Sequence, residues 1–312
     1  MVNYNDIESA HNRISNFIHN TPILTCENIN LESNAKLFFK CDNFQKTGSF
    51  KIRGATNTIL QLSKKQIKNG VITTSSGNHG AAVAATAKKL GANVKVIMPN
   101  NTPKVKINNV QRYGGEIIFC EPNIKARENT LNEMVKESGS TIVHPYNDEK
   151  VIAGQGTAAK ELLEKVADLD IIITPVSGGG LLAGTSLLAK SINPNIKVYG
   201  AEPKNADDTY QSIKNKKIVP NKTTETIADG LRAQVGTITF PIIQKNVDGI
   251  ILVSEEMIIQ SMRTIWQRMK IIIEPSCSIA LAAILINNEQ FHNKRIGIIL
   301  TGGNVDLDSL PW

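Results

Sequence analysis

The 312-residue sequence is poor in aromatic residues and has no long apolar run. Aromatic residues make up 5% of the chain and hydrophobic residues 41%, so aliphatic side chains must form most of the core. No stretch approaches the roughly 18 consecutive apolar residues of a membrane-spanning helix. The polar N-terminal segment MVNYNDIESAHNRI also lacks the apolar region of an export signal. We therefore expect neither export nor membrane insertion.

The sequence has only four cysteines, which excludes a disulfide-stapled fold. Cys26, Cys41, Cys120 and Cys277 lie far apart, form no CxxC pair and have no histidine at metal-ligand spacing. Free thiols of this kind are typical of a reducing compartment. We expect a cytoplasmic protein.

Basic charge is in excess but is not concentrated in one patch. The net charge is +7, and the densest basic stretches, at 63–70 and 214–217, are short and lack interleaved aromatics. Nucleic-acid binding requires a clustered basic surface. We therefore expect no nucleic-acid partner, although a modest positive field favours small anionic molecules.

Short β-branched apolar runs alternate with helix-period segments along almost the whole chain. The candidate strands are 37–40, 70–74, 93–99, 116–119, 141–144, 170–176, 197–202, 249–253 and 295–301. Candidate helices between them include 81–91, 156–166 and 181–192. This alternation predicts an α/β fold of parallel sheets covered by helices on both faces, and the length allows two lobes.

Three of the candidate strands end in small, glycine-rich polar loops. These are SSGNHG (75–80), SGGG (177–180) and GGN (302–304). Ligands in parallel sheets bind at the carboxyl ends of strands, so we expect these loops to line a site. Helix capping by Ser and Asn is an alternative for 75–80, and simple turns are alternatives for the other two.

The loop SGGGLLAG, residues 177–184, is suited to a phosphate group. Consecutive glycines let backbone amides point inward, and a following helix N-terminus adds partial positive charge. The spacing matches neither GxGxxG nor GxxxxGK[ST], which disfavours dinucleotides and nucleoside triphosphates. A phosphate monoester held without a dedicated lysine is the better match.

Lys51 stands between Phe50 and Ile52 in KTGSFKIRGA, residues 46–55. A lysine in such a place can snorkel to solvent. A lysine that is desolvated instead has a lowered pKa, and its neutral amine can form a Schiff base. Together with a phosphate loop and with Thr301 at the end of a third strand, it favours pyridoxal phosphate as the cofactor.

Two further patterns carry weaker signals. EPKNADD, residues 202–208, places three carboxylates after a strand, which suits either a solvated loop or oxygen ligation of a hard divalent cation. The five histidines show no arrangement with a carboxylate and a nucleophile, so a hydrolase triad is not supported.

The motifs taken together resemble the fold type II pyridoxal-phosphate enzymes, and among them the serine racemase and serine/threonine/3-hydroxyaspartate dehydratase group. The resemblance runs from about residue 15 to the C-terminus in family order. The motifs that show it are KTGSFKIRGA, SSGNHG, IAGQGT (152–157), SGGGLLAG, EPKNADDTYQS, TIADG (226–230), IEPS (273–276) and LTGGNVDL. It implies a tryptophan synthase β-like fold, with a large cofactor-binding domain (1–60 and 149–312), an inserted small domain (61–148) and a homodimer.

The resemblance also implies cofactor contacts. Lys51 would bind the cofactor and take the substrate Cα proton, Phe50 would pack beside the ring, and Asn78 would bind the phenolic oxygen. Thr301 would face the pyridine nitrogen, and a neutral hydroxyl there favours loss of a β-hydroxyl over transamination. The phosphate would be held by Ser177, Gly178, Gly179, Gly180 and Leu181.

Further residues would bind substrate and metal in the same family. Ser75, Asn78 and the backbone at His79 would bind the substrate carboxylate, and Ser76 would face the cofactor opposite the lysine, where racemases exchange a proton. Arg127 would pair with a second carboxylate, which points toward 3-hydroxyaspartate. Glu202, Asp208 and the carbonyl of Ala206 would bind magnesium, manganese or calcium.

The sequence departs from the family pattern at several positions. Tyr146 stands where animal racemases have asparagine, and Cys277 and Ser278 replace the usual Ala-Gly after EPS. Tyr113 lies where some eukaryotic members bind ATP, a regulation that we do not extend to this chain. The resemblance includes no regulatory domain after the catalytic unit, so feedback inhibition by isoleucine is not expected.

We therefore expect an ammonia-lyase that converts L-serine, L-threonine or 3-hydroxyaspartate to a 2-oxo acid and ammonia. An amino-acid racemase with dehydratase side activity is the alternative, motivated by Ser76. A cysteine synthase-type enzyme is disfavoured because Ile52 and Arg53 follow the lysine where that type has Asp-Arg. A non-catalytic binder is disfavoured because it has no need for Lys51, Asn78 and Thr301 together.

Overall fold

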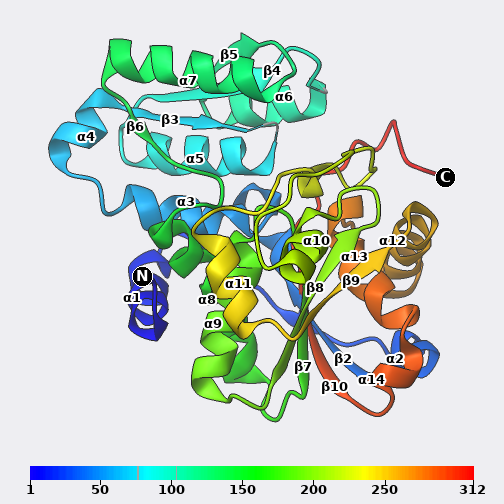
Figure 1. The fold of residues 1–312 in the computed structure, drawn as a ribbon. Helices are drawn as coiled ribbons and strands as arrows, with labels where there is room; N and C mark the ends of the chain where they lie inside the picture. The colour runs from blue at the N-terminus through cyan, green and yellow to red at the C-terminus, as the bar shows by residue number, and fades with distance from the viewer. Residues whose placement is uncertain (76, 103) are drawn as a thin grey trace.

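The computed structural model describes residues 1–75, 77–102 and 104–312, without the side chain of Ile124. These residues form two twisted sheets covered by helices, one in each half of the molecule as seen in Figure 1. The first sheet has the strand order β1-β2-β10-β7-β8-β9 and the second β5-β4-β3-β6.

The six-stranded sheet holds the larger part of the core. Its strands are β1 (Ile23–Leu24), β2 (Lys36–Cys41), β7 (Ile171–Pro175), β8 (Lys197–Pro203), β9 (Gly249–Val253) and β10 (Arg295–Leu300). All neighbours in it pair in parallel except β1, which runs antiparallel to β2 at the edge. The central strands β7 and β10 are almost continuous aliphatic runs because helices cover both of their faces.

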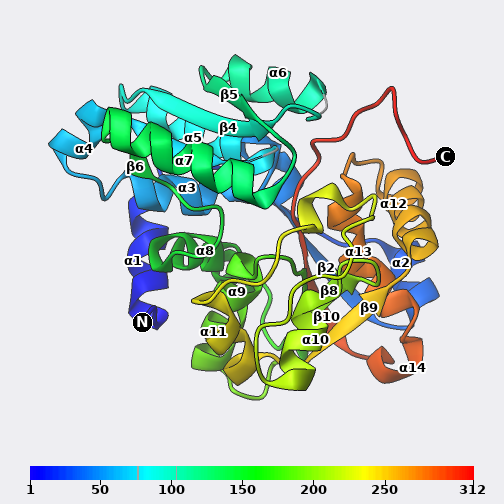
Figure 2. The same cartoon turned by 45° about the horizontal axis from the view of Figure 1, so that its top comes forward.

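The four-stranded sheet is all parallel and is built from one continuous stretch of chain. Its strands are β3 (Val71–Thr74), β4 (Val94–Pro99), β5 (Glu116–Cys120) and β6 (Thr141–Ile142). Helices α4 to α7 belong to this half, which lies uppermost in Figure 1 and comes toward the viewer in Figure 2.

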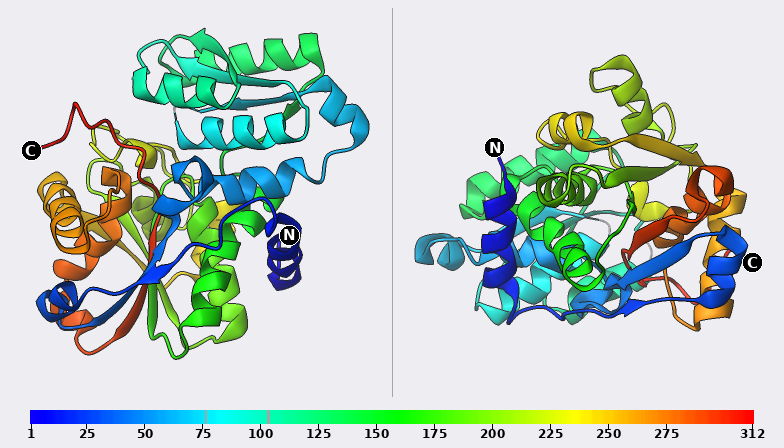
Figure 3. Two further views of the ribbon diagram at one scale, coloured as in Figure 1. Left: turned by 180° about the vertical axis from the view of Figure 1, so that it is seen from behind. Right: turned by 90° about the horizontal axis from the view of Figure 1, so that it is seen from below.

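Helices connect most of the strands. They are α1 (Tyr4–Ile14), α2 (Glu27–Ser33), α3 (Lys51–Ile59), α4 (Lys64–Asn69), α5 (Asn78–Lys89), α6 (Lys104–Arg112), α7 (Ile124–Ser138), α8 (Glu149–Lys165), α9 (Gly180–Ile192), α10 (Asp208–Asn215), α11 (Thr239–Asn246), α12 (Glu255–Met269), α13 (Pro275–Leu285) and α14 (Asn288–Phe291). Short 3₁₀ turns lie at η1 (Asp42–Phe44), η2 (Lys46–Gly48) and η3 (Asp229–Leu231). Helix α1 lies beside α8 on the outer side of the larger half (Figure 3).

Helices α3, α8 and α9 pack with their backbones in close approach, and glycines make this possible. A Cβ on Gly154 of α8 would lie 2.6 Å from the Cα of Gly54 in α3. A Cβ on Gly184 of α9 would lie 2.5 Å from the carbonyl oxygen of Ile152 in α8. The glycines of IAGQGT therefore serve packing, because they seat α8 directly between α3 and α9.

The predicted α/β class and the parallel strands are confirmed, whereas several predicted boundaries are wrong. Helix α8 begins at Glu149 instead of 156, and α5 begins at Asn78 instead of 81. The strand predicted at 141–144 is only Thr141–Ile142. The antiparallel edge strand β1 was not anticipated because two residues leave no periodic signal. The domain boundaries at 60/61 and 148/149 stay a prediction.

Among the described residues, no helix is both long and apolar enough to cross a membrane.

Candidate active site

Lys51 is the first residue of α3, and its amine is buried from solvent. Its Nζ donates a hydrogen bond to the carbonyl oxygen of Pro145 at 3.0 Å. Burial lowers the pKa of Lys51 to about 8, with the charge of Glu274 acting in the opposite direction. With a pKa of about 8, about a tenth of the amine is neutral at pH 7, far more than for an ordinary lysine, as suits a Schiff-base lysine.

The turn that leads into Lys51 is strained and is held from the far end of the chain. Thr47 has φ +66° although it is β-branched, and Gly48 follows at φ +71°. Asn304 donates to the carbonyl of Thr47 at 2.8 Å, and the amide of Phe50 donates to the carbonyl of Thr301 at 2.9 Å. The segment after β10 thus fixes the entry to α3, and the ring of Phe50 lies 5.1 Å from the Lys51 amine.

Two neutral imidazoles stand near the lysine. Burial and the nearby Lys51 lower the pKa of His79 to about 3 and that of His144 to about 4. His79 Nε2 pairs with the carbonyl of Val143 at 3.0 Å, and His144 Nδ1 accepts from the amides of Tyr146 and Asn147. Both side chains therefore keep structural contacts and add no charge to the site.

The glycine loop after β7 presents unpaired amides. Gly179 adopts φ +90° and precedes α9, which begins at Gly180. Among the described residues, no acceptor pairs with the amides of Gly178, Gly179, Gly180 or Leu181. Four free N–H groups at the start of a helix could bind an anion, and their use for a phosphate stays a prediction.

The back of this loop is firmly held. Thr239 Oγ1 and the amide of Gly236 both donate to the carbonyl of Gly178, at 2.7 and 3.2 Å. The hydroxyl of Ser177 donates to the carbonyl of Ala233 and accepts from its amide, each at 3.0 Å. The Ser177 hydroxyl is thus engaged by Ala233, so its predicted share in phosphate binding would fall to its backbone.

Tyr146 packs on the front of the same loop. A Cβ on Gly178 would overlap the Tyr146 ring, and one on Gly180 would lie 3.2 Å from the Cα of Tyr146. The ring of His144 meets the Tyr146 ring edge to face, with centroids 4.7 Å apart. Because Lys51 contacts Pro145, the residue before Tyr146, the lysine and the glycine loop are linked through this short segment.

Asn78, the first residue of α5, contacts the segment before α13 and the segment after β10. Its Nδ2 donates to both oxygens of Glu274, at 2.8 and 3.1 Å, and its Oδ1 accepts from Asn304 at 2.8 Å. Burial raises the pKa of Glu274, with Lys106 acting in the opposite direction. The predicted partner of the cofactor's phenolic oxygen is therefore oriented by Glu274, which immediately precedes α13, and by the loop after β10.

Ser75 and Thr301 occupy the ends of β3 and β10. Ser75 Oγ accepts from the amides of Gly77 and Gly80, at 3.1 and 3.0 Å, so its hydroxyl pairs two amides at the start of α5. The N-cap position itself is Gly77, which makes no side-chain cap, so the capping alternative for SSGNHG is wrong in its strict form. Thr301 is buried beside Cys277, and burial raises the pKa of that thiol to about 12. Ser76 lies outside the described residues.

Arg127 is a cation without an anionic partner in the part of the chain that the structure describes. It lies on α7, and its Nε is buried without a hydrogen-bond partner among the described residues. Its charge acts on Tyr146, the residue that packs on the glycine loop. A role for Arg127 in binding a carboxylate stays a prediction.

The predicted cation site contains two buried carboxylates. Burial and the charge of Asp208 raise the pKa of Glu202 to about 8, and burial raises that of Asp208 to about 6. Glu202 accepts from the amides of Thr209 and Tyr210, and Asp208 accepts from the amide of Val235 at 2.7 Å. No described residue donates to the carbonyl of Ala206.

This donor set fits a hard cation, because it combines uncompensated negative charge with a free carbonyl oxygen. The predicted set includes two side-chain donors, the carboxylates of Glu202 and Asp208. Over the described ranges, no group of three or more His, Cys, Asp and Glu side chains is arranged to hold a metal. A cation here would therefore complete its coordination with the Ala206 carbonyl and water.

Several contacts at the site had no role in the sequence analysis. Pro145 supplies only a backbone carbonyl, which no side-chain pattern reveals. Glu274 and Asn304 lie within recognised motifs, yet their pairing with Asn78 joins positions 196 and 226 apart in the sequence. The departure at Tyr146 was visible from the sequence, but its packing against Gly178 was not.

Comparison with known proteins agrees with this geometry. The family model described as "Pyridoxal-phosphate dependent enzyme" matches residues 14–302. A serine racemase of Dictyostelium discoideum is 49% identical over 99% of this chain and 97% of its own, and its crystal structure superposes with a TM-score of 0.93 over 98% and 99% of the chains. A beta-hydroxyaspartate dehydratase of Paracoccus denitrificans (strain Pd 1222) is 45% identical over 99% and 98%.

A crystal structure of threonine deaminase from T.th. has a TM-score of 0.93 at 36% identity, over 98% of this chain and 99% of that one. The chain belongs to the pyridoxal-phosphate-dependent enzymes, and its relatives include serine racemases and a hydroxyaspartate dehydratase. The fold is that of the fold type II members. The residues present fit the cofactor, because a buried amine of lowered pKa lies one short segment away from four amides that no described residue pairs.

Proposed function

We propose that the protein is a pyridoxal-phosphate-dependent ammonia-lyase that converts a small β-hydroxy amino acid to a 2-oxo acid and ammonia. The observation that carries this proposal is the Lys51 amine, desolvated at the start of α3 and linked through Pro145 and Tyr146 to the glycine loop. The cofactor supplies an electron sink for the electrons left behind when the substrate loses its Cα proton.

The chain's own residues perform the remaining tasks. The amides of Gly178 to Leu181 would hold the phosphate, and Asn78, fixed by Glu274 and Asn304, would bind the phenolic oxygen. Lys51 would hold the cofactor through Nζ, and the same amine, once free, would take the substrate Cα proton. Thr301 would be the partner of the ring nitrogen, and a neutral hydroxyl there would keep the electron sink weak and favour departure of the β-hydroxyl.

Arg127 favours a substrate with a second carboxylate. Its Nε has no partner among the described residues, and a guanidinium binds a carboxylate in bidentate geometry. The hydroxyaspartate dehydratase relative acts on such a substrate by its name. We therefore place 3-hydroxyaspartate, which would give oxaloacetate, ahead of L-serine and L-threonine, which would give pyruvate and 2-oxobutanoate.

A serine racemase with dehydratase side activity is the second candidate, favoured by the name of the Dictyostelium relative. Racemisation needs proton transfer on both faces of the cofactor, and Ser76 would supply the second face. Ser76→Ala should then lower racemisation while elimination continues. An equal loss of both activities would exclude the two-faced role.

Three further properties belong to the same proposal. A divalent cation binds Glu202, Asp208 and the Ala206 carbonyl, and the enzyme works as a homodimer. The four free cysteines suit a cytoplasmic location. The cation and the dimer are supported by the donor set and by family resemblance, respectively.

Product analysis tests the function directly. Purified protein with pyridoxal phosphate and Mg²⁺ is given L-serine, L-threonine and L-threo-3-hydroxyaspartate, and the 2-oxo acids are measured while D-serine is followed by chiral chromatography. Oxaloacetate in excess of the other products, with little D-serine, supports the lyase. D-serine formed faster than pyruvate supports the racemase, and no product from any of the three contradicts both.

A further inference from the structure

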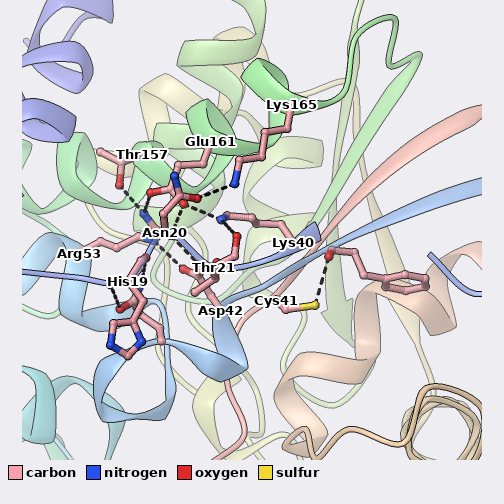
Figure 4. A network of polar contacts seen from close by, with 12 residues as sticks. His19, Asn20, Thr21, Lys40, Cys41, Asp42, Arg53, Thr157, Glu161 and Lys165 are labelled. Atoms are coloured by element: carbon pink, nitrogen blue, oxygen red, sulfur yellow. Dashed lines mark hydrogen bonds and ion pairs between the residues drawn. The ribbon is translucent and has the colours of Figure 1, made fainter. Parts of the chain in front are cut away.

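A buried cluster of charges lies beside α3 and has no part in the proposed chemistry (Figure 4). Lys40, Asp42, Arg53 and Glu161 meet there, and none of these side chains is more than 2% exposed. Their charges sum to zero. Removing four charges from water is costly unless every one of them is well paired, and apolar side chains can often replace such groups without loss of stability. We therefore expect the cluster to have a role other than stabilising the fold.

Arg53 is the centre of the cluster, and all five of its N–H groups are used. Asp42 accepts from Nε at 2.6 Å and from Nη2 at 2.9 Å. Glu161 accepts from Nη1 at 2.7 Å and from Nη2 at 2.9 Å, and Thr157 Oγ1 accepts from Nη1 at 3.1 Å. Two bidentate carboxylates and a hydroxyl fix both the position and the plane of the guanidinium.

The acceptors come from rigid elements of the larger half. Asp42 follows β2 directly, and Glu161 and Thr157 lie on α8. Lys40, on β2, donates to Glu161 at 2.5 Å and to the carbonyl of Thr21 at 2.7 Å, which secures the carboxylate from the other side. Arg53 is therefore tied to the central sheet and to α8 at once.

Arg53 lies two residues after Lys51, in the first turn of α3. Within the described residues, no side chain caps the start of this helix, so it lacks the usual local anchor. Its first turn is held by the Phe50 amide on Thr301 and by the Arg53 side chain. The amide of the next residue, Gly54, donates to Gln155 of α8 at 3.2 Å.

The same helix α8 also supports the glycine loop. It touches α3 through Gly54 and Gly154 and touches α9 through Gly156 and Gly184. A shift of α3 on α8 would therefore change the distance between Lys51 and the cradle at the start of α9. Side chains cannot absorb such a shift where backbones are in direct contact.

We propose that Arg53 is a positioning residue for Lys51: clamped by Asp42 and Glu161, it fixes the first turn of α3 on α8 and so sets the reach and desolvation of the lysine relative to the glycine loop. This inference rests on the proposed role of Lys51 as the cofactor lysine. A purely structural cluster would stabilise the fold and leave the lysine's properties unchanged when it is weakened.

The experiment compares Arg53→Lys with Lys40→Met. Arg53→Lys keeps the charge and loses the bidentate geometry, whereas Lys40→Met removes a cation of the same cluster that is not on α3. The first readout is the pH dependence of the rate at which each apoprotein attaches pyridoxal phosphate to Lys51, followed by absorbance. Thermal midpoints, kcat and KM are measured in parallel. Glu274, whose charge acts on Lys51, and His79 and His144, on which the charge of Lys51 acts, are unchanged in both variants.

In Arg53→Lys we expect the pH midpoint of attachment to rise from near 8, because a looser α3 hydrates the amine. We also expect kcat to fall by about tenfold or more with little change in KM. Lys40→Met should lower the thermal midpoint and leave the attachment midpoint in place. An unchanged midpoint and kcat in folded Arg53→Lys, or an equal midpoint shift in Lys40→Met, would overturn the proposal.

If Arg53→Lys does not fold, Thr157→Val is tested in its place, because it removes one of the five hydrogen bonds that Arg53 donates. It should shift the midpoint in the same direction by a smaller amount, and no shift in Thr157→Val would then overturn the proposal. Failure of the wild-type protein to attach the cofactor at Lys51 is a different outcome. It would contradict the proposed function itself.

Discussion

The Lys51 amine donates a hydrogen bond to the carbonyl of Pro145 at 3.0 Å, and Tyr146, which follows Pro145 in the chain, packs on Gly178. The segment after β6, the start of α3 and the glycine loop therefore meet at one point. A cofactor that bridges an amine and a phosphate cradle would replace the contact with Pro145. The amine must therefore be exchangeable between two partners, which its lowered pKa makes less costly.

Replacement of Lys51 should abolish covalent cofactor binding. We expect Lys51→Ala to retain pyridoxal phosphate weakly through the amide cradle, to show no mass increase after borohydride reduction and to lose roughly 10² to 10⁴ in kcat. Mass spectrometry of the reduced protein is the measurement. Lys46→Ala is the matched control, because the Lys46 amine is engaged by the carbonyl of Phe17 at 2.8 Å. Labelling at another lysine in wild-type protein would contradict the assignment.

A side chain at Gly178 should weaken cofactor binding through steric conflict with Tyr146. The Cβ of Gly178→Ala would overlap the Tyr146 ring, so either the ring or the loop must move. We expect a cofactor affinity about tenfold lower or worse, measured by equilibrium titration of absorbance. The double variant Gly178→Ala/Tyr146→Ala should recover part of the affinity. No recovery would place the defect in the loop backbone.

Arg127 should control selectivity for a dicarboxylate. In Arg127→Gln, we expect kcat/KM for 3-hydroxyaspartate to fall by about 10- to 100-fold, since a charged hydrogen-bonded pair contributes about 1.5–3 kcal/mol. The value for L-serine should change little. Arg127→Lys, which keeps the charge and loses the bidentate geometry, should lie between the two. Equal losses for both substrates would mean that Arg127 does not bind the second carboxylate.

Removal of divalent cations should destabilise the protein through the 202–208 segment. Asp208 also holds the Val235 amide, and the neighbouring Gly236 amide holds the carbonyl of Gly178. We expect chelation to lower the thermal midpoint and weaken cofactor binding, and Mg²⁺, Mn²⁺ or Ca²⁺ to restore both. Asp208→Asn should abolish the response to added cation. A wild-type midpoint that is insensitive to chelator and cation would contradict the site.

Acid should destabilise the protein partly through His79. Its folded pKa of about 3 lies below the ordinary value of 6.5, so the unfolded chain binds the proton first as pH falls through that window. Stability is therefore full above pH about 6.5 and declines as pH falls toward 3, by up to about 1.4 kcal/mol per pH unit. His79→Gln, which keeps a donor for Val143, should show a shallower decline in denaturant titrations. His292→Gln, at an exposed position, controls for loss of an imidazole.

The fold class and the glycine loop were predictable because their signals are local. Alternating β-branched runs and helical periods mark parallel strands and their crossovers, and consecutive glycines after a strand mark an amide cradle. The start of α3 was less visible, since the helix follows Phe50, which cannot cap it through a side-chain hydrogen bond. Its anchor is the Arg53 side chain, whose partners lie 11 and 108 positions away.

Contacts between distant segments could not be derived from the sequence by pattern alone. The pairing of Asn78 with Glu274 and Asn304 depends on how the two sheets are placed, and the motifs that contain these two residues do not indicate that they pair with Asn78. The Pro145 contact uses a backbone carbonyl, which every residue possesses. Cysteine at 277 was visible as a departure, but only the structure shows that it lies beside Thr301.

The left-handed turn at Thr47 is held by Asn304, a residue 257 positions later in the chain. A nascent chain therefore contains Lys51 long before it contains the residue that secures the approach to that lysine. The turn at Thr47 can take its final form only after residue 304 has been translated, so the N-terminal segment alone cannot complete the approach to Lys51.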